Sequence, residues 1–229
     1  MNCPACHTEN AAEAKFCGNC GHSLTEEVVA SGYFQFFKHA LQAPTAIMKS
    51  GKVEVRNGII SLVLICFLGA CIFYRVMSAA ATVTKTFAPD ISTPTFFLDS
   101  VTVFLFLLIL TLFVGFIIFV SGKMMKSSFS FLEVFGIWGT IATPAIVILV
   151  LSFLFSFLLI FFLPILLGLA TTYMGISIIV ATVKLDNGGL DLVYTLFIAN
   201  IFIGIATFIV FWSYINTIIQ TFTQGLTGL

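Results

Sequence analysis

Four cysteines near the N-terminus have the spacing that most clearly predicts chemistry. They form two Cys-x2-Cys pairs, Cys3 with Cys6 and Cys17 with Cys20, separated by ten residues. Each pair makes a tight turn that directs two sulfurs to one point, and four thiolates suit a tetrahedral zinc ion with every position closed. The sequence therefore predicts one structural zinc ion bound by Cys3, Cys6, Cys17 and Cys20.

The segment that carries these cysteines, residues 1–24, is too short to fold on a hydrophobic core alone. Domains below about 40 residues usually need a metal or disulfides, and zinc can contribute about 10–16 kcal/mol to the folding of such peptides. Two disulfides are the alternative, and they require an oxidising compartment. Iron also suits four sulfurs, so the donor set alone does not separate it from zinc.

The sequence contains no recognisable catalytic set. All three histidines lie within residues 1–56, and we interpret His7 and His22 as surface residues beside the cysteines. There is no His-Glu-x-x-His motif, no glycine-rich phosphate loop and no pair of carboxylates within an apolar segment. A closed four-sulfur site also leaves no position for a reacting water. We therefore expect no enzymatic activity, no catalytic residue and no organic cofactor.

The composition is that of a membrane protein. Hydrophobic residues make up 59% of the chain and charged residues 9%, whereas soluble domains are roughly 45–50% apolar and about 25% charged. The mean hydropathy is +1.12. Ten Lys and Arg balance ten Asp and Glu, so the net charge gives no reason to expect a nucleic acid partner.

Five apolar segments after residue 56 are long enough to cross a bilayer, which takes about 20 residues in a helix. These spans are 57–80, 99–121, 134–160, 163–183 and 190–214. Residues 134–183 carry no charge, and one helix over them would be about 75 Å long, so we expect two spans joined near Phe161–Pro164. The predicted fold is an all-α polytopic membrane protein with five transmembrane helices (domain 57–229) and a small N-terminal zinc ribbon.

Residues 25–56 form a predicted linker that contains an amphipathic helix. Five apolar residues fall on one face at helical spacing, namely Tyr33, Phe34, Phe37, Ala40 and Leu41. Such a helix is expected to lie at the inner membrane surface, and Pro44 ends the run. A solvated linker with aromatic residues at chance positions is the alternative.

The distribution of basic residues predicts the orientation in the membrane. Five spans place the two termini on opposite sides, and cytoplasmic segments carry the excess of Lys and Arg. With the N-terminus inside, the inner segments carry Lys38, Lys49, Lys52, Arg56, Lys123, Lys126 and Lys184. The outer segments carry Arg75 and Lys85. We therefore expect a multi-pass protein of the cell (plasma) membrane, with a cytoplasmic ribbon and the C-terminus outside.

Polar and small residues in the spans are interpreted as structural. Asp99 and Asp191 are expected to cap helix N-termini, Asn200 to bond a neighbouring helix, and Cys66 and Cys71 to fill apolar space. Small residues at packing positions let helices approach closely. They are Gly136, Gly139, Gly168, Thr172, Gly175 and Gly204.

Two stretches resemble the Yip family of five-pass membrane proteins. The first runs from Gly122 through Ser128-Phe129 to Pro144, and the second covers Thr171–Asn200 with its Lys-Leu-Asp-Asn-Gly-Gly turn. The resemblance implies a five-span fold with a cytoplasmic N-terminus. The Asp-Leu-Tyr-Gly-Pro motif of eukaryotic members is absent here, so their binding of small GTPases is not carried over. The cysteine pairs resemble the zinc ribbon of many Gram-positive bacterial membrane proteins.

These observations favour a non-enzymatic membrane adaptor or regulator whose zinc ribbon binds a cytoplasmic protein. The alternative is a small transporter or permease component for a neutral or apolar substrate, because the spans carry Gly and Pro interruptions but few charges. The expected partners are the lipid bilayer and one cytoplasmic protein, with no nucleic acid. The sequence leaves a homo-oligomer open.

Overall fold

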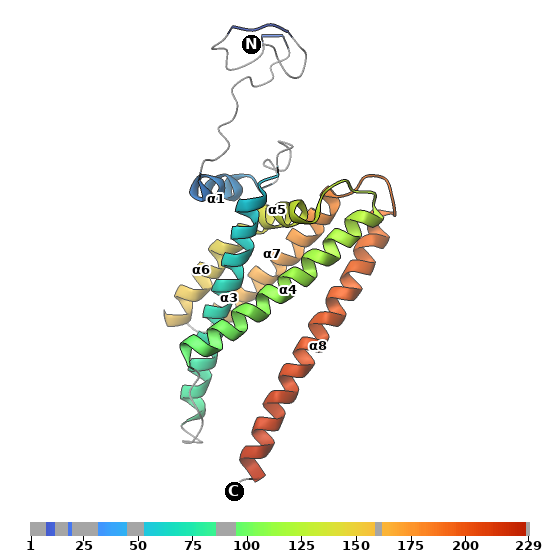
Figure 1. The fold of residues 1–229 in the computed structure, drawn as a ribbon. Helices are drawn as coiled ribbons and strands as arrows, with labels where there is room; N and C mark the ends of the chain where they lie inside the picture. The colour runs from blue at the N-terminus through green and yellow to red at the C-terminus, as the bar shows by residue number, and fades with distance from the viewer. Residues whose placement is uncertain are drawn as a thin grey trace. The chain divides into compact units, whose positions relative to one another are not determined.

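The computed structural model describes residues 8–11, 18–19, 32–44, 53–85, 95–158 and 162–227. The chain divides into two compact units, Met1–His39 and Ala40–Leu229. The described part of the second unit consists of helices and their connections. Its helices are α3 (Val55–Thr84), α4 (Phe96–Met124), α5 (Phe131–Ala142), α6 (Ala145–Leu158), α7 (Leu163–Lys184) and α8 (Leu192–Thr227) (Figure 1).

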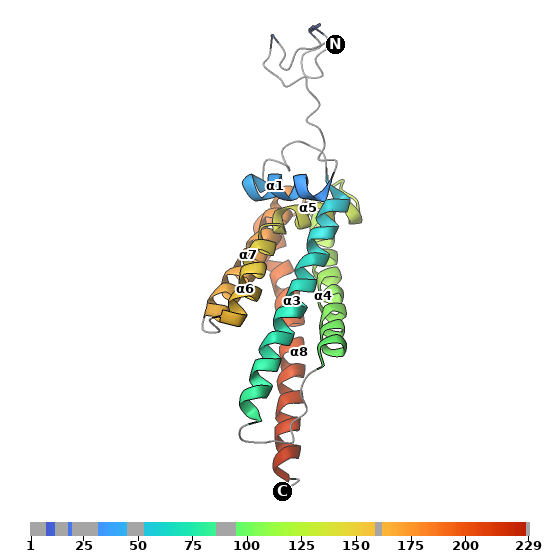
Figure 2. The same ribbon diagram turned by 90° about the vertical axis from the view of Figure 1, so that its left-hand side faces the viewer.

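Four of these helices are long and apolar enough to cross a membrane: α3, α4, α7 and the Leu192–Ile209 part of α8. A fifth span is present if α5 and α6 count as one broken span. In both views α5 lies across the end of the bundle at which α3 begins (Figure 1, Figure 2). The predicted all-helical membrane fold is therefore confirmed, with four or five candidate spans.

The segment expected as one span over residues 134–160 is divided in the structure. Its two parts, α5 and α6, meet at Thr143–Pro144 and are bent by 53° relative to each other. Proline lacks the N–H that would continue the helical ladder, and its ring clashes with the preceding turn. The hydroxyl of Tyr173 on α7 donates to the Ile141 carbonyl at 2.9 Å, which supplies a donor for a carbonyl near the break.

Helices α3 and α5 cross with their backbones in contact. A Cβ added to Gly58 would lie 2.8 Å from the Cα of Gly136, and one added to Gly139 would overlap the backbone of Gly58. The predicted close approach is confirmed for Gly136 and Gly139, whose partner Gly58 was not among the predicted residues. Only residues without a side chain allow this separation. The same prediction is wrong for Gly168, Gly175 and Gly204, where an added Cβ would meet nothing within 4 Å among the described residues.

The helix α5 is the centre of the packed core, although its 12 residues reach only about 18 Å. Nine consecutive residues, Val134 to Ala142, are buried. The indole N–H of Trp138 donates to the hydroxyl of Ser177 on α7 at 3.0 Å. On the α4 side, Gly115 leaves room for the ring of Phe135. Thus α3, α4 and α7 each contact α5 through side chains or backbone fitted to it.

The connections at this end of the bundle are hydrogen-bonded to each other. The N–H of Ser127 donates to the Gly122 carbonyl at 2.9 Å, closing the C-terminal turn of α4, and Lys126 takes the left-handed conformation with φ 59°. The N–H of Leu190, just before α8, donates to the Met124 carbonyl at 2.9 Å. The end of α4 and the start of α8 are therefore fixed side by side.

Helix caps account for the acidic residues at the span entrances. Asp191 accepts the N–H of Val193 at 2.8 Å, so its predicted capping role is confirmed. Asp99 accepts the backbone N–H of Thr95 at 2.6 Å. Thr95 is the N-cap residue of α4, so Asp99 bonds to the N-cap residue and is not itself the N-cap. Glu133 likewise accepts the N–H of Ser130 at 2.7 Å, an arrangement that the Ser-x-x-Glu spacing signals.

The predicted helix of the linker is α1 (Tyr33–Gln42), which includes the boundary between the two units at His39 and Ala40. Phe36 and Ala40, which are four residues apart, are buried. Phe34 and Leu41 are exposed, by 79% and 39%. Its location at a membrane surface stays a prediction.

We expect Gly139→Ala to destabilise the membrane domain by about 1–3 kcal/mol, because the new methyl group overpacks the α3–α5 crossing. The matched control is Gly168→Ala on α7, where an added Cβ meets nothing within 4 Å. The control should leave stability unchanged or raise it slightly, since Ala favours helix over Gly by about 1 kcal/mol. Thermal unfolding in detergent, followed by tryptophan fluorescence, compares the two. Equal melting temperatures would contradict the importance of the crossing.

Candidate functional site

The four predicted metal ligands, Cys3, Cys6, Cys17 and Cys20, lie outside the described residues. Two short described segments flank them, residues 8–11 and residues 18–19. The second segment lies inside the Cys17–Cys20 pair, and the first begins two residues after Cys6. The two segments contact each other through hydrogen bonds.

Asn10 joins the two segments. Its side-chain oxygen accepts the backbone N–H of Gly18 at 3.0 Å, and its amide group donates to the carbonyl of Thr8 at 2.7 Å. A second link runs from the Asn19 amide to the Thr8 hydroxyl at 3.2 Å. Two hydrogen bonds therefore join residues 8–10 to residues 18–19.

This arrangement fits the donor set that the sequence predicts. Four thiolates from two turns close a tetrahedral zinc site completely, and hydrogen bonds behind the turns hold such ligands in place. A zinc ion held by Cys3, Cys6, Cys17 and Cys20 would supply folding energy to the head. It would offer no open position for a reacting water.

Elsewhere in the described residues, no three His, Cys, Asp or Glu side chains lie close enough together to hold a metal ion. Cys66 and Cys71 on α3 are buried, in agreement with their predicted packing role, and the Cys66 sulfur lies 3.2 Å from the Thr111 hydroxyl. Asn200 is exposed and donates to the Leu196 carbonyl of its own helix at 2.8 Å. The predicted bond from Asn200 to another helix was therefore wrong.

A buried chain of hydroxyl groups lies at the break between α5 and α6. The hydroxyl oxygens of Ser61 and Thr143 are 2.9 Å apart, and Thr143 donates to the Gly139 carbonyl at 2.8 Å. The Ser61 hydroxyl also lies 3.2 Å from the backbone carbonyl of Asn57, so its single proton is shared between this carbonyl and Thr143. The pairing of Ser61 with Thr143 was not recognisable from the sequence. Ser and Thr are common in transmembrane helices, and only the fold brings α3 to the break between α5 and α6.

Asn57 begins this chain and is 2% exposed. Its side-chain amide donates to the Glu54 carboxylate at 2.8 Å, which leaves its oxygen directed away from that carboxylate. No donor among the described residues reaches this oxygen. Amide and hydroxyl groups of this kind bind neutral polar groups or water, and they supply no acid–base pair.

Comparison with known proteins identifies the head. Residues 2–24, which include all four cysteines, match the zinc-ribbon domain family. No curated protein and no solved structure matches the chain. The predicted N-terminal zinc ribbon is thus confirmed as a domain type, and the Yip-like character of the membrane body stays a prediction.

We expect purified wild-type protein to carry one zinc ion per chain, and a Cys17→Ser, Cys20→Ser variant to carry none, because two thiolates no longer close a tetrahedron. Metal analysis by inductively coupled plasma mass spectrometry measures both. Iron in place of zinc, or no metal together with oxidised cysteines, would contradict the expectation.

Asn10→Ala should weaken zinc binding by about tenfold, because it removes the hydrogen bond to Gly18, a residue between the predicted ligands Cys17 and Cys20 in the sequence, and hydrogen bonds behind the ligands support metal affinity. Glu9→Ala is the matched control, since the neighbouring Glu9 side chain is exposed. Competition with a chromogenic chelator measures both affinities. Equal affinities would show that the Asn10 contact does not support the site.

Proposed function

We propose that this protein is a non-enzymatic membrane adaptor or regulator whose zinc ribbon binds a cytoplasmic protein partner. The observation that carries the proposal is the zinc-ribbon match at residues 2–24, joined in one chain to a helical membrane body. A four-thiolate ion has a structural role. The ribbon would then contribute to the function through a protein surface whose fold this ion stabilises.

The connection between the two parts supports an adaptor. The 30 residues between the ribbon and α3 span at most about 100 Å when fully extended, and α1 (Tyr33–Gln42) shortens this reach. A partner bound to the ribbon would therefore stay close to the membrane. Its effective concentration there would rise without any further contact.

The arrangement of basic residues supports a cytoplasmic ribbon. Four bases lie at the end of the bundle where α3 begins and α4 and α7 end, namely Arg56, Lys123, Lys126 and Lys184. Arg75 and Lys85 lie toward the other end of α3. Positive charge is enriched in cytoplasmic segments, so the end with four bases is the one we assign to the cytoplasm.

The orientation is tested by labelling introduced cysteines with a membrane-impermeant maleimide. In intact cells, Lys85→Cys should be labelled and Lys126→Cys protected until the membrane is permeabilised. The buried Cys66 and Cys71 should contribute little in either case. The reverse pattern would place the ribbon outside the cell.

The adaptor function is tested by crosslinking in cells followed by affinity capture of the full-length protein. Cytoplasmic proteins recovered with the wild type should be lost from the Cys17→Ser, Cys20→Ser variant and from a variant lacking residues 1–24. Equal amounts of each variant in the membrane fraction provide the control. An unchanged set of captured proteins would refute the proposal.

A second candidate is a small transporter or permease component, favoured by the break at Thr143–Pro144. Transporters place neutral and ionic substrates at discontinuous helices, and here Ser61 and Thr143 lie buried at such a break. The test is flux of neutral solutes into liposomes, with Ser61→Ala as the variant. Flux that is absent, or that Ser61→Ala leaves unchanged, would count against this function.

A further inference from the structure

Helix α8 is packed against the bundle near its start and less closely farther along. Its buried side chains among the described residues are Thr195 and Ala199. On the same face, Ile203 and Ala206 are only half-buried, and Ile209 is 61% exposed. The two helices α4 and α8 lie close together at one end and diverge from it (Figure 1).

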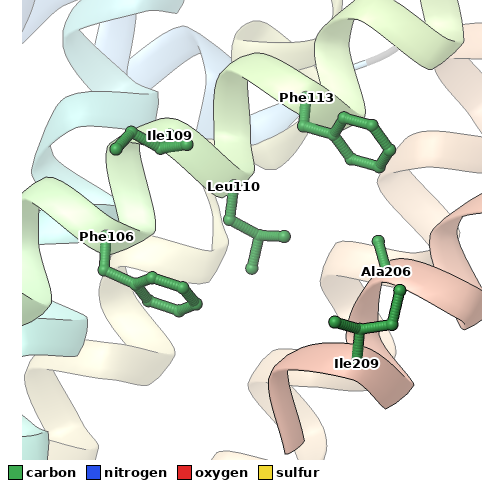
Figure 3. Close-up of a pocket in the computed structure, with 6 residues that line it drawn as sticks. All are labelled: Phe106, Ile109, Leu110, Phe113, Ala206 and Ile209. Atoms are coloured by element: carbon green, nitrogen blue, oxygen red, sulfur yellow. The ribbon is translucent and has the colours of Figure 1, made fainter. Parts of the chain in front are cut away.

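A hollow of about 280 Å³ lies where α4 and α8 separate. Four residues of α4 and two of α8 line it, namely Phe106, Ile109, Leu110, Phe113, Ala206 and Ile209. Phe106, Leu110 and Phe113 project from α4 toward the α8 residues (Figure 3). Every lining side chain is a hydrocarbon, so nothing in this groove would hold a polar ligand.

The groove exists because a small residue faces large ones. Ala206 on α8 presents one methyl group to the aromatic and aliphatic side chains of α4, which are too far away to close over it. Phe106 and Phe113 each remain 40% exposed. The α4 positions 106, 109, 110 and 113 form one helical face, and no side chain whose placement is described covers the middle of this face.

The depth of the groove in the bilayer indicates what fills it. Helix α4 runs from Phe96 to Met124, so Leu110 lies at its midpoint, and the four lining positions extend only about 5 Å to either side. This is the middle of a hydrocarbon layer that is about 30 Å thick. The material available at that depth is lipid hydrocarbon, and both leaflets reach it with the ends of their long acyl chains.

We propose that an acyl chain of a membrane phospholipid is bound in the groove between α4 and α8. A helix of a second copy, about 10–12 Å across, is too wide to enter this hollow, whereas a single hydrocarbon chain is slender and flexible enough. The bound chain restores the van der Waals contacts that Ala206 does not make. It thereby holds α8 to the bundle along the part of the helix after Ala199, where side chains are less buried.

The test is lipid retention by the full-length protein, measured by native mass spectrometry after purification in mild detergent. Ala206→Phe fills the groove and should lower the fraction of protein that retains a phospholipid by about tenfold. The matched control is Leu112→Phe, which lies about 100° around α4 from Phe113, does not line the groove and is 55% exposed; it should retain lipid as the wild type does. Unchanged fluorescence of the buried Trp138 serves as the folding control.

A second measurement applies even where Ala206→Phe does not fold. Phe113→Trp and Leu112→Trp are made separately in a background that lacks Trp138 and Trp212, and the proteins are reconstituted in phospholipid with brominated acyl chains. After dilution into unbrominated lipid, quenching should persist for Phe113→Trp and be lost for Leu112→Trp. Equal loss in both would overturn the proposal. So would a retained isoprenoid in place of a phospholipid, or a dimer that Ala206→Phe dissociates with no change in lipid.

Discussion

The contact between the backbones of α3 and α5 determines how the rest of the membrane body is arranged. Because Gly58, Gly136 and Gly139 carry no side chains, the backbones of α3 and α5 touch. Helix α5 therefore packs directly against α3 at the end of the bundle. A helix so placed lies across one end of the spans and cannot itself continue through the membrane. The chain must turn before it can cross, and Thr143–Pro144 is where it turns.

Several buried polar side chains lie beside this turn. Breaking a helix in a lipid environment exposes carbonyl groups that water cannot reach. Tyr173 donates to the Ile141 carbonyl, and the hydroxyls of Ser61 and Thr143 lie together beside the break. Trp138 is bonded to Ser177 in the same region. Among the described residues, these hydrogen bonds join α3, α5 and α7 at and beside the break.

Much of the architecture was predictable because membranes simplify the physics. Long apolar segments must be helices when they cross lipid, and hydropathy therefore located α3, α4, α7 and the start of α8. The zinc ribbon was predictable because Cys-x2-Cys spacing reflects a single coordination geometry. In both cases one strong constraint acts on residues that are near each other in the sequence.

What the sequence could not predict depends on contacts between distant residues. Pro144 lies within a continuous apolar segment. The hydropathy of this segment does not indicate that α5 and α6 differ in direction. Gly58 resembles any other helical glycine until α5 lies on it. Asn200 was predicted to bond to a neighbouring helix because polar groups in spans usually find partners there. It lies instead on the exposed face of α8, next to the buried Ala199, and donates to the Leu196 carbonyl of its own helix.

The length and charge of α8 have a consequence for how the protein responds to its membrane. Its 36 residues make a helix of about 54 Å, well beyond a hydrocarbon layer of about 30 Å, and residues 192–229 carry no charged side chain. Its first end is fixed by Asp191 and the hydrogen bonds to α4, whereas no charged side chain lies along the rest of the helix. Changes in bilayer thickness can therefore be accommodated by tilting α8 about its fixed end, at little cost to the bundle.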